Sequence, residues 1–314
     1  MLRKKHLLSV VIPVYNEQES ITETFSRLVK MRETSALVIE IEFLFVDDGS
    51  KDQSLQLLCG FAENHQFVKV LSLSRNFGHQ IAVTAGIDMA KGDFVAVIDA
   101  DLQDPPELIT KMYSLAMSGV DVVYGKRRSR AGESWFKKVT AAAFYRLMNY
   151  MCETEIPADT GDFRLMSRRV VDDFKKMRER HRFVRGMVPW LGYNSAPLEY
   201  DRAERFAGET KYPLKKMLSF ATTAILSFSS KPLTLAIRLG FLIILIGVIG
   251  SIYMLFLKLY TSTPIPGLPA ILLSIVLFSG VQIFLIGVVG EYIARIFEEV
   301  KGRPLYLVAK SVNI

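Results

Sequence analysis

Two aspartates, Asp99 and Asp101, follow an apolar stretch and are separated by one residue. Because alternate residues that leave a strand point to the same side, both carboxylates can meet one cation. Hard cations such as Mg²⁺ and Mn²⁺ take oxygen ligands and often share them with the phosphates of a substrate. Gln103 lies two positions further on and offers another oxygen. The spacing therefore favours a divalent metal site, and a solvated turn is the alternative for such a pair.

Polar residues also follow two earlier apolar stretches, at Pro13–Glu17 and at Asp47–Ser50. The first of them lacks the glycine pattern that dinucleotide binding needs after a first strand. The chain also has no G-x-x-x-x-G-K-[ST] phosphate loop and no G-x-S-x-G nucleophile elbow. These absences argue against a Rossmann dehydrogenase, a P-loop NTPase and a serine hydrolase.

The stretches that must position these residues alternate between strand and helix patterns. We expect strands at Leu7–Val14, Val38–Val46, Phe67–Leu73, Phe94–Ile98 and Val120–Tyr124, and helices at Glu17–Arg32, from Lys51, at Gly78–Ala90 and at Pro105–Met117. This order predicts an α/β fold with a mostly parallel, doubly wound, Rossmann-like sheet. In such sheets ligands bind beyond the carboxyl ends of the strands, which is where the polar residues lie.

Two uncharged apolar runs, Leu239–Leu257 and Leu268–Gly290, occupy the C-terminal quarter of the chain. A helix needs about 20 residues to cross a hydrocarbon core of roughly 30 Å. The segment 261–267 between them contains two prolines and a glycine, which is typical of a turn. The sequence therefore predicts a C-terminal two-helix transmembrane hairpin, and a pair of buried helices in a soluble protein is the alternative.

Basic residues flank this hairpin on one side. They are Lys231 and Arg238 before the first run, and Arg295, Lys301 and Arg303 after the second. By the positive-inside rule both ends face the cytoplasm, and the first residues hold no apolar stretch long enough for a signal peptide. We expect a cytoplasmic domain over 1–210, an amphipathic juxtamembrane helix over 211–232, transmembrane helices over 233–260 and 268–293, an extracytoplasmic turn over 261–267 and a cytoplasmic tail over 294–314.

Composition narrows the class of protein. The chain has 314 residues, of which 50% are hydrophobic, and a formal net charge of +7. The apolar content excludes a disordered chain, and the distant Cys59 and Cys152 indicate free thiols rather than a metal site. The positive charge favours an anionic partner, namely a phosphorylated substrate, lipid headgroups or nucleic acid. No nucleic-acid-reading module is recognisable, so we expect no nucleic-acid partner.

Several segments carry a family resemblance in their order and spacing. VVIPVYNE, FVDDGSKD, SLSRNFGHQIAVTAG and VIDADLQDPPE resemble the family 2 glycosyltransferases with a GT-A fold. The later DTGDFRLMSR and RAERFAGETKY narrow the resemblance to the polyprenyl-phosphate glycosyltransferases, which include dolichol-phosphate mannose synthases. The two apolar runs followed by GEYIARIFEEVKGRPLY are most similar to the bacterial bactoprenol (undecaprenyl-phosphate) glucosyltransferases of O-antigen modification.

This resemblance implies a role for each polar cluster. The residues expected to hold the nucleotide are Pro13, Tyr15, Asn16, Glu17, Asp47, Asp48, Arg75 and Asp99. Asp99, Asp101 and Gln103 would coordinate a Mg²⁺ or Mn²⁺ ion that bridges the donor diphosphate, and we count Asp101 as catalytic as well. For Asp47 and Asp48, an Asx turn before Gly49 is the alternative.

Asp162 lies in the segment that resembles the acceptor side of the family, where a general base is often invoked. The acceptor is a phosphate monoester with its second pKa near 6, so at pH 7 it is mostly a dianion and needs little deprotonation. Asp162 would then orient the acceptor or the sugar hydroxyls as much as take a proton. A helix-capping Asp before FRLMSRR is the structural alternative, and Asp159 is a competing carboxylate.

Basic and amphipathic segments can meet the anionic acceptor. The residues expected at the phosphates are Arg127, Arg128, Arg202, Arg205 and Lys211. Arg forks bind phosphate oxygens bidentately, whereas Lys acts as a point charge; a solvated face or lipid headgroups are the alternatives. The segments Trp135–Met151 and Tyr212–Phe228 set aromatics beside lysines, which is typical of helices in a membrane interface. Packing against the domain is the alternative for both.

The expected reaction is a single in-line displacement with inversion, in which an acceptor phosphate oxygen attacks C1 of the sugar and the nucleoside diphosphate leaves. The resemblance implies UDP-glucose as donor and undecaprenyl phosphate as acceptor, at the cytoplasmic face of a bacterial inner membrane. Nothing in the donor loops distinguishes glucose from mannose, N-acetylglucosamine or an aminoarabinose derivative. Related enzymes are known as tetramers, but no sequence feature specifies a homo-oligomer.

Three rival functions remain as alternatives. A processive polysaccharide synthase shares the Asp elements but typically carries Q-x-x-R-W, which this chain lacks. A transporter of two spans has no ionisable residue within either run to mark a pathway. An inactive, membrane-anchored scaffold that binds a nucleotide sugar is the third, and the intact Asp99, Asp101 and Asp162 argue against it.

Overall fold

The structure is a computed structural model that describes residues 5–128, 160–201, 229, 231–260 and 267–314. Within these residues one sheet has eight strands in the order β7-β5-β6-β4-β1-β2-β3-β8. The strands are β1 (Leu7–Val14), β2 (Glu40–Asp47), β3 (Val68–Leu73), β4 (Phe94–Val97), β5 (Val122–Arg127), β6 (Thr160–Ser167), β7 (Ser195–Tyr200) and β8 (Val308–Val312). The helices are α1 (Ile21–Ser35), α2 (Ser54–Asn64), α3 (His79–Met89), α4 (Leu108–Met117), α6 (Arg168–Lys176), α7 (Val184–Trp190), α9 (Lys231–Tyr260) and α10 (Leu268–Val300).

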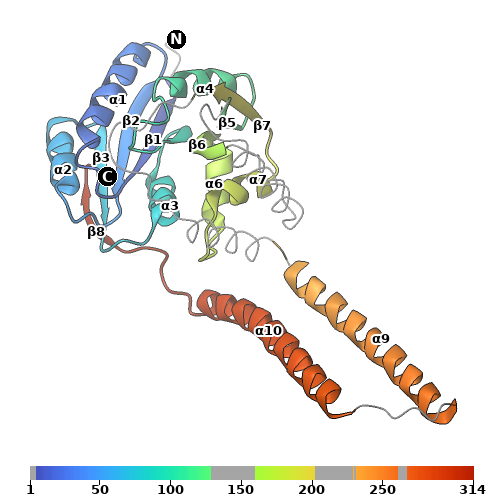
Figure 1. Cartoon of the computed structure of the whole chain (residues 1–314). Helices are drawn as coiled ribbons and strands as arrows, with labels where there is room; N and C mark the ends of the chain where they lie inside the picture. Colours follow the sequence, from blue (N-terminus) through green and yellow to red (C-terminus); the bar gives the residue numbers. More distant parts are fainter. Residues whose placement is uncertain (1–4, 129–159, 202–228, 230, 261–266) are drawn as a thin grey trace.

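The centre of the sheet is parallel and buried on both faces. β1 pairs in parallel with β2 and β4, and β2 pairs in parallel with β3. Val10 and Ile12 of β1 pack in a cluster with α1, α2 and α4, whereas Val11 packs in a second cluster with α3, α6 and α7. The helices therefore cover both faces (Figure 1), which confirms the doubly wound α/β architecture.

Two strands run against this parallel core. β6 is antiparallel to both β4 and β5, and β8 is antiparallel to β3 at the edge of the sheet. The sequence predicted the strands β1 to β5. It predicted neither the antiparallel strands β6 and β8 nor β7, which runs parallel to β5. The sheet is therefore mixed. Because β6 is antiparallel to β4, the first residues of β6 lie at the edge of the sheet where β4 ends.

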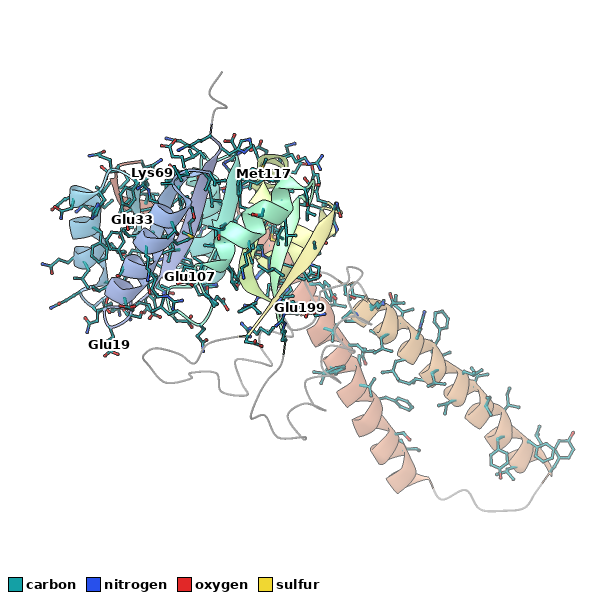
Figure 2. The ribbon with its side chains drawn as sticks, turned by 90° about the horizontal axis from the view of Figure 1, so that it is seen from above. Glu19, Glu33, Lys69, Glu107, Met117 and Glu199 are labelled. Atoms are coloured by element: carbon teal, nitrogen blue, oxygen red, sulfur yellow. The ribbon has the colours of Figure 1, made fainter. Side chains whose placement is uncertain are left out.

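The two apolar runs form long helices that extend from the domain side by side (Figure 1). By length and composition both are candidates to cross a membrane, over Lys231–Gly250 and Phe278–Val300. Their apolar side chains project outward (Figure 2), and Phe241 and Ile283 are 70% and 71% exposed. Helices this apolar and this exposed are not the buried pair of a soluble core.

The C-terminal end of α10 contacts the domain. Glu299 accepts the backbone N–H of Arg180 at 2.6 Å, and Glu298 forms an ion pair with His181 at 2.9 Å. The chain then returns to the sheet as β8, where Asn313 donates to the carbonyls of Ala62 and Val68. The segment expected as a cytoplasmic tail thus contains the last turns of α10 and an edge strand of the domain.

Candidate active site

One edge of the sheet gathers the polar residues that the sequence singled out. Figure 2 shows Glu19, Glu107 and Glu199 along one side of the domain, and Lys69 and Met117 along the other. The first side carries the carboxyl ends of the parallel strands. Val97 of β4 pairs with Arg164 of β6, and continuing that antiparallel register sets Asp162 opposite Asp99. Two acidic residues far apart in sequence therefore meet at this edge.

The loop after β4 holds its carboxylates in a constrained turn. Asp101 is only 9% exposed, and its Oδ1 accepts the backbone N–H of Gln103 at 3.1 Å. Leu102 between them is buried with φ of 59°, a left-handed backbone that costs an ordinary residue about 1–2 kcal/mol. Such strain persists where the surroundings enforce it, and it clusters at functional sites. The buried Asp101 excludes the solvated turn that the sequence left open.

Asp99 carries excess negative charge around an unsatisfied oxygen. Its Oδ1 is buried and accepts no hydrogen bond from the described residues. Burial raises the pKa of Asp99 to about 6; His79 opposes this shift, while Asp162, Asp104 and Asp101 add to it. A desolvated carboxylate that repels its neighbours is stabilised by a cation.

The chemistry of this loop fits a divalent metal ion. The part of the chain that the structure describes holds no group of three or more His, Cys, Asp or Glu arranged for a metal. Mg²⁺ is usually held by one or two protein carboxylates together with substrate phosphates and water. Asp99, with its orphaned oxygen, and Asp101 beside it supply that number of carboxylates.

Asp162 is enclosed by donors. The side chain is 1% exposed, and Arg185 donates to it twice, from Nε at 3.1 Å and from Nη2 at 3.0 Å. Gln80 Nε2 and His79 Nε2 lie 3.1 Å from the same carboxylate. Burial alone raises the pKa of Asp162, but Arg185 and His79 outweigh it and hold the pKa well below its usual range. The carboxylate is thus a fixed anion.

The helix-capping alternative for Asp162 is wrong. Asp162 lies within strand β6, and the following helix α6 begins only at Arg168. The apolar residues after it, including Phe163 and Leu165, are fully buried in the sheet. The competing carboxylate Asp159 lies outside the described residues.

Sequence reasoning missed three residues of this site: His79, Gln80 and Arg185. His79 begins α3 and reaches both acidic elements, with Nε2 3.1 Å from Asp162 Oδ2 and 3.6 Å from Asp99 Oδ1. Burial by itself lowers the pKa of His79, but Asp99 and Asp162 raise it to about 9. The signal for His79 and Gln80 was their place after the third strand, at the same edge; no local pattern marks Arg185.

The loops after β1 and β2 are bonded to each other. Asn16 has φ of 55°, donates its N–H to Ser50 Oγ at 3.0 Å and accepts the N–H of Lys51 at 2.8 Å. Glu17 donates its N–H to Ser54 Oγ at 2.9 Å. Pro13 is the penultimate residue of β1, and Tyr15 is 42% exposed beside this joint. The predicted nucleotide residues of the first loop therefore lie together at the edge where the parallel strands end.

The two aspartates after β2 make internal hydrogen bonds. Asp47 accepts the N–H of Ser50 at 3.1 Å and the hydroxyl of Ser72 at 2.8 Å. Asp48 accepts the N–H groups of Phe77 and Gly78 at 2.7 and 2.9 Å. Burial raises the pKa of Asp48, and those two backbone donors oppose the shift. Both carboxylates shape the loops here, and their contact with a nucleotide stays a prediction.

Three predicted arginines lie at the ends of other strands, since Arg75 follows β3, Arg127 ends β5 and Arg128 follows it. Arg75 stacks over the Phe77 ring, with its guanidinium carbon 4.1 Å from the ring centroid. Arg128 lies 3.7 Å from Glu199 at the surface. Arg127 lies near Gly161 and Tyr200, and its Nε is buried without a hydrogen-bond partner among the described residues. Arg127 is therefore the better placed of the two strand-end arginines for an anion.

Several predicted residues lie outside the described part of the chain. These are Arg202, Arg205, Lys211 and the two amphipathic segments, Trp135–Met151 and Tyr212–Phe228. Their expected roles at the phosphates and in the membrane interface remain predictions.

Comparison with known proteins identifies the family. The model of Glycosyl transferase family 2 matches residues 9–174, a range that includes Asp99, Asp101 and Asp162. The uncharacterized glycosyltransferase YkcC of Bacillus subtilis is 50% identical over 98% of this chain and 94% of its own length. The SfII prophage-derived bactoprenol glucosyl transferase of Shigella flexneri is 40% identical over 97% of this chain and 98% of its own. The structure of mannosyl-3-phosphoglycerate synthase from Rubrobacter xylanophilus is 18% identical with a TM-score of 0.48, covering 71% of this chain and 73% of that one. The chain belongs to glycosyltransferase family 2, with a GT-A fold, and it is a glycosyltransferase.

Proposed function

We propose that this enzyme transfers glucose from UDP-glucose to undecaprenyl phosphate, with inversion at C1 of the sugar. The observation that carries the proposal is the meeting of two acidic elements at one sheet edge, Asp99 with its unsatisfied buried oxygen and Asp162 with its cationic partners. A relative that covers 97% of the chain is named a bactoprenol glucosyl transferase, which supports the acceptor and the sugar. A role in O-antigen or cell-envelope glycan modification would follow from the same product.

Asp99, Asp101 and Gln103 would hold a Mg²⁺ or Mn²⁺ ion in this reaction. When bound, such an ion stabilises the negative charge of the departing nucleoside diphosphate. The turn at Leu102 and the Gln103 N–H keep Asp101 in place before any ligand arrives. The nucleotide would lie against the joined loops after β1 and β2, next to the exposed face of Tyr15.

The acceptor needs little help to become a nucleophile. A phosphate monoester with its second pKa near 6 is mostly a dianion at pH 7. Asp162 has its pKa held well below the usual range and lies enclosed by Arg185, Gln80 and His79. We therefore assign Asp162 an orienting role at the acceptor side. Arg127, and outside the described residues Arg202, Arg205 and Lys211, would neutralise the phosphates.

The two long helices would anchor the enzyme in a bacterial inner membrane. The flanking basic residues favour an orientation with both chain ends and the catalytic domain in the cytoplasm. We keep the expected division into a domain over 1–210, a juxtamembrane helix over 211–232, spans over 233–260 and 268–293, a turn over 261–267 and a tail over 294–314, with β8 returning from that tail to the sheet. A homo-oligomer such as a tetramer stays a prediction.

The test is transfer from radiolabelled UDP-glucose to undecaprenyl phosphate by the full chain in detergent, with Mg²⁺ or Mn²⁺ against EDTA. We expect metal-dependent glycolipid that is lost in Asp101→Asn. Product with GDP-mannose, UDP-GlcNAc or a UDP-aminoarabinose derivative instead would keep the reaction and overturn the donor. No transfer from any donor, with nucleotide-sugar binding retained, would favour the inactive scaffold.

A further inference from the structure

We propose that His79 and Arg185 together bind a substrate phosphate, and that Asp162 is the positioning residue that holds this pair. The inference rests on the proposed function and deepens it. The phosphate belongs either to the polyprenyl phosphate or to the diphosphate of the donor, since both present the same oxygens. Asp162 in this account does not take a proton from the acceptor.

The first support is that the carboxylate oxygens of Asp162 accept hydrogen bonds from protein side chains. Its Oδ1 accepts from Arg185 Nε, and its Oδ2 accepts from Arg185 Nη2, Gln80 and His79. Both oxygens thus bond to side chains of the protein, and the residue is 1% exposed. A general base must reach the proton that it removes, directly or through one water. Asp162 is bonded inward instead.

The second support is the exposure of its partners. The side chains of His79 and Arg185 are 43% and 30% exposed, although each is bonded to the enclosed carboxylate. Arg forks and imidazole N–H groups are strong donors to phosphate oxygens. These two side chains, rather than Asp162, are the surface that a substrate meets.

The third support is the rigidity of the pair. The backbone of Val184, one residue before Arg185, is hydrogen-bonded through both its N–H and its carbonyl. Gln80 Oε1 accepts its N–H at 2.8 Å, and the buried guanidinium of Arg164 donates to its carbonyl at 3.2 Å. The amino ends of α3 and α7 are thereby joined to β6. A binding group on a rigid support loses less entropy when its ligand arrives.

The fourth support is the position between the two acidic elements. His79 Nε2 lies 3.6 Å from Asp99 Oδ1, on the metal side, and 3.1 Å from Asp162 Oδ2, on the acceptor side. In an in-line displacement the attacking and leaving phosphates flank the sugar carbon. Cationic donors at this junction can therefore meet a phosphate of one substrate or the other.

The experiment compares Arg185→Gln, Arg185→Lys and His79→Gln in the full chain, with Arg178→Gln as the matched control. Arg178 lies between α6 and α7 and pairs with Asp88, which is at the opposite end of α3 from His79. We expect Arg185→Gln to raise the KM or the dissociation constant of one phosphate substrate at least about tenfold, the cost of one charge-assisted hydrogen bond. Arg185→Lys restores part of this loss, since it keeps the charge without the fork. Arg178→Gln leaves both constants unchanged.

The two sources of the phosphate separate in this assay. A weaker undecaprenyl phosphate with unchanged UDP-glucose assigns the pair to the acceptor, and the reverse assigns it to the donor. Unchanged constants for both substrates, with wild-type activity intact, overturn the inference and leave the proposed function standing. If the wild type makes no product, calorimetric binding of UDP and of a short polyprenyl phosphate to the same variants decides the inference by itself.

A double-mutant cycle tests the part assigned to Asp162. If Asp162 acts through Arg185, then Asp162→Asn combined with Arg185→Gln binds the phosphate substrate no more weakly than Arg185→Gln alone. Thermal unfolding of each variant checks that the fold is retained. A loss of kcat in Asp162→Asn that adds in full to the Arg185→Gln loss, without any change in phosphate affinity, contradicts the positioning role and restores the base.

Discussion

At the edge of the sheet where the parallel strands end, the loops after β1 and β2 differ from the loop after β4 in how their polar groups are hydrogen-bonded. In the loops after β1 and β2, Asn16, Asp47 and Asp48 all accept hydrogen bonds from neighbouring loop residues. In the loop after β4, Asp99 keeps a buried oxygen without a donor among the described residues, and burial together with nearby carboxylates raises its pKa. The named polar groups of the loops after β1 and β2 are hydrogen-bonded without a ligand, whereas the loop after β4 carries negative charge that a ligand must balance.

This difference predicts how these loops respond to substitution. A desolvated charge that its neighbours compensate only in part costs stability, so it persists where function requires it. Asp162 shows the opposite solution within the same cluster, because Arg185 and His79 compensate its charge. We therefore expect changes at Asp99 to reduce activity while they raise stability. Changes at Asn16, Asp47 or Asp48 should instead reduce stability, in addition to any loss of nucleotide binding.

The largest expected effect is that of Asp99→Asn. We expect transfer to fall at least about 100-fold, which is typical for the loss of one group that stabilises a developing charge. The melting temperature of the metal-free protein should rise, because a desolvated and repelled carboxylate is removed. Asp121→Asn is the matched control, since Asp121 is a buried carboxylate that is paired with Arg169 and Ser167. It should lower the melting temperature, and a lower melting temperature in both variants would contradict the contrast.

The next effect concerns the packing of α3, the helix that begins with His79, against the sheet. A Cβ on Gly86 would lie 2.2 Å from Val11 Cγ1 and 3.0 Å from Val46 Cγ2. Gly86→Ala should therefore reduce the free energy of unfolding by about 1–3 kcal/mol through overpacking. Gly60 of α2 has no atom within 4 Å of such a Cβ, so Gly60→Ala should stabilise by about 0.5–1 kcal/mol. Thermal denaturation of the two variants measures both, and equal effects would refute the packing argument.

A smaller effect follows from the titration of Asp99. Its pKa is raised from 3.8 to about 6 in the folded protein. A raised folded pKa gives stability that is complete below pH 3.8 and is lost as the pH rises through about 6. The melting temperature of Asp99→Asn minus that of the metal-free wild type should therefore increase over this window, by a few degrees in order of magnitude. A constant difference would mean that Asp99 is not perturbed.

Much of the fold could be predicted because the buried strands are continuous apolar runs. Leu7–Val14 is a strand with the expected bounds, and Phe94 begins β4 as expected. The first helix was expected from Glu17 but begins at Ile21. Glu17–Ser20 instead forms a turn in which Ser20 and Ile21 donate to the carbonyl of Glu17. The polar residues between β1 and α1 thus form a turn, and the helix begins only after it.

Local spacing could predict the site residues that share one loop, but not the contacts between residues from different strands and helices. Asp99, Asp101 and Gln103 share one loop, so local spacing revealed them. The meeting of Asp162 with His79 and Arg185 depends on the antiparallel insertion of β6 beside β4, which is a contact between distant segments. Similarly, β8 joins the sheet from the far end of the chain. Neither pairing leaves a local pattern that the sequence analysis could use.

The most direct test of the central claim is Mn²⁺ binding in the presence of UDP, followed by electron paramagnetic resonance on the full chain in detergent. We expect the wild type to bind Mn²⁺ together with UDP, Asp99→Asn to lose this binding and Asp121→Asn to keep it. Absence of Mn²⁺ binding in the wild type, or undiminished binding in Asp99→Asn, would contradict the claim that the charge at this edge is balanced by a metal and its nucleotide.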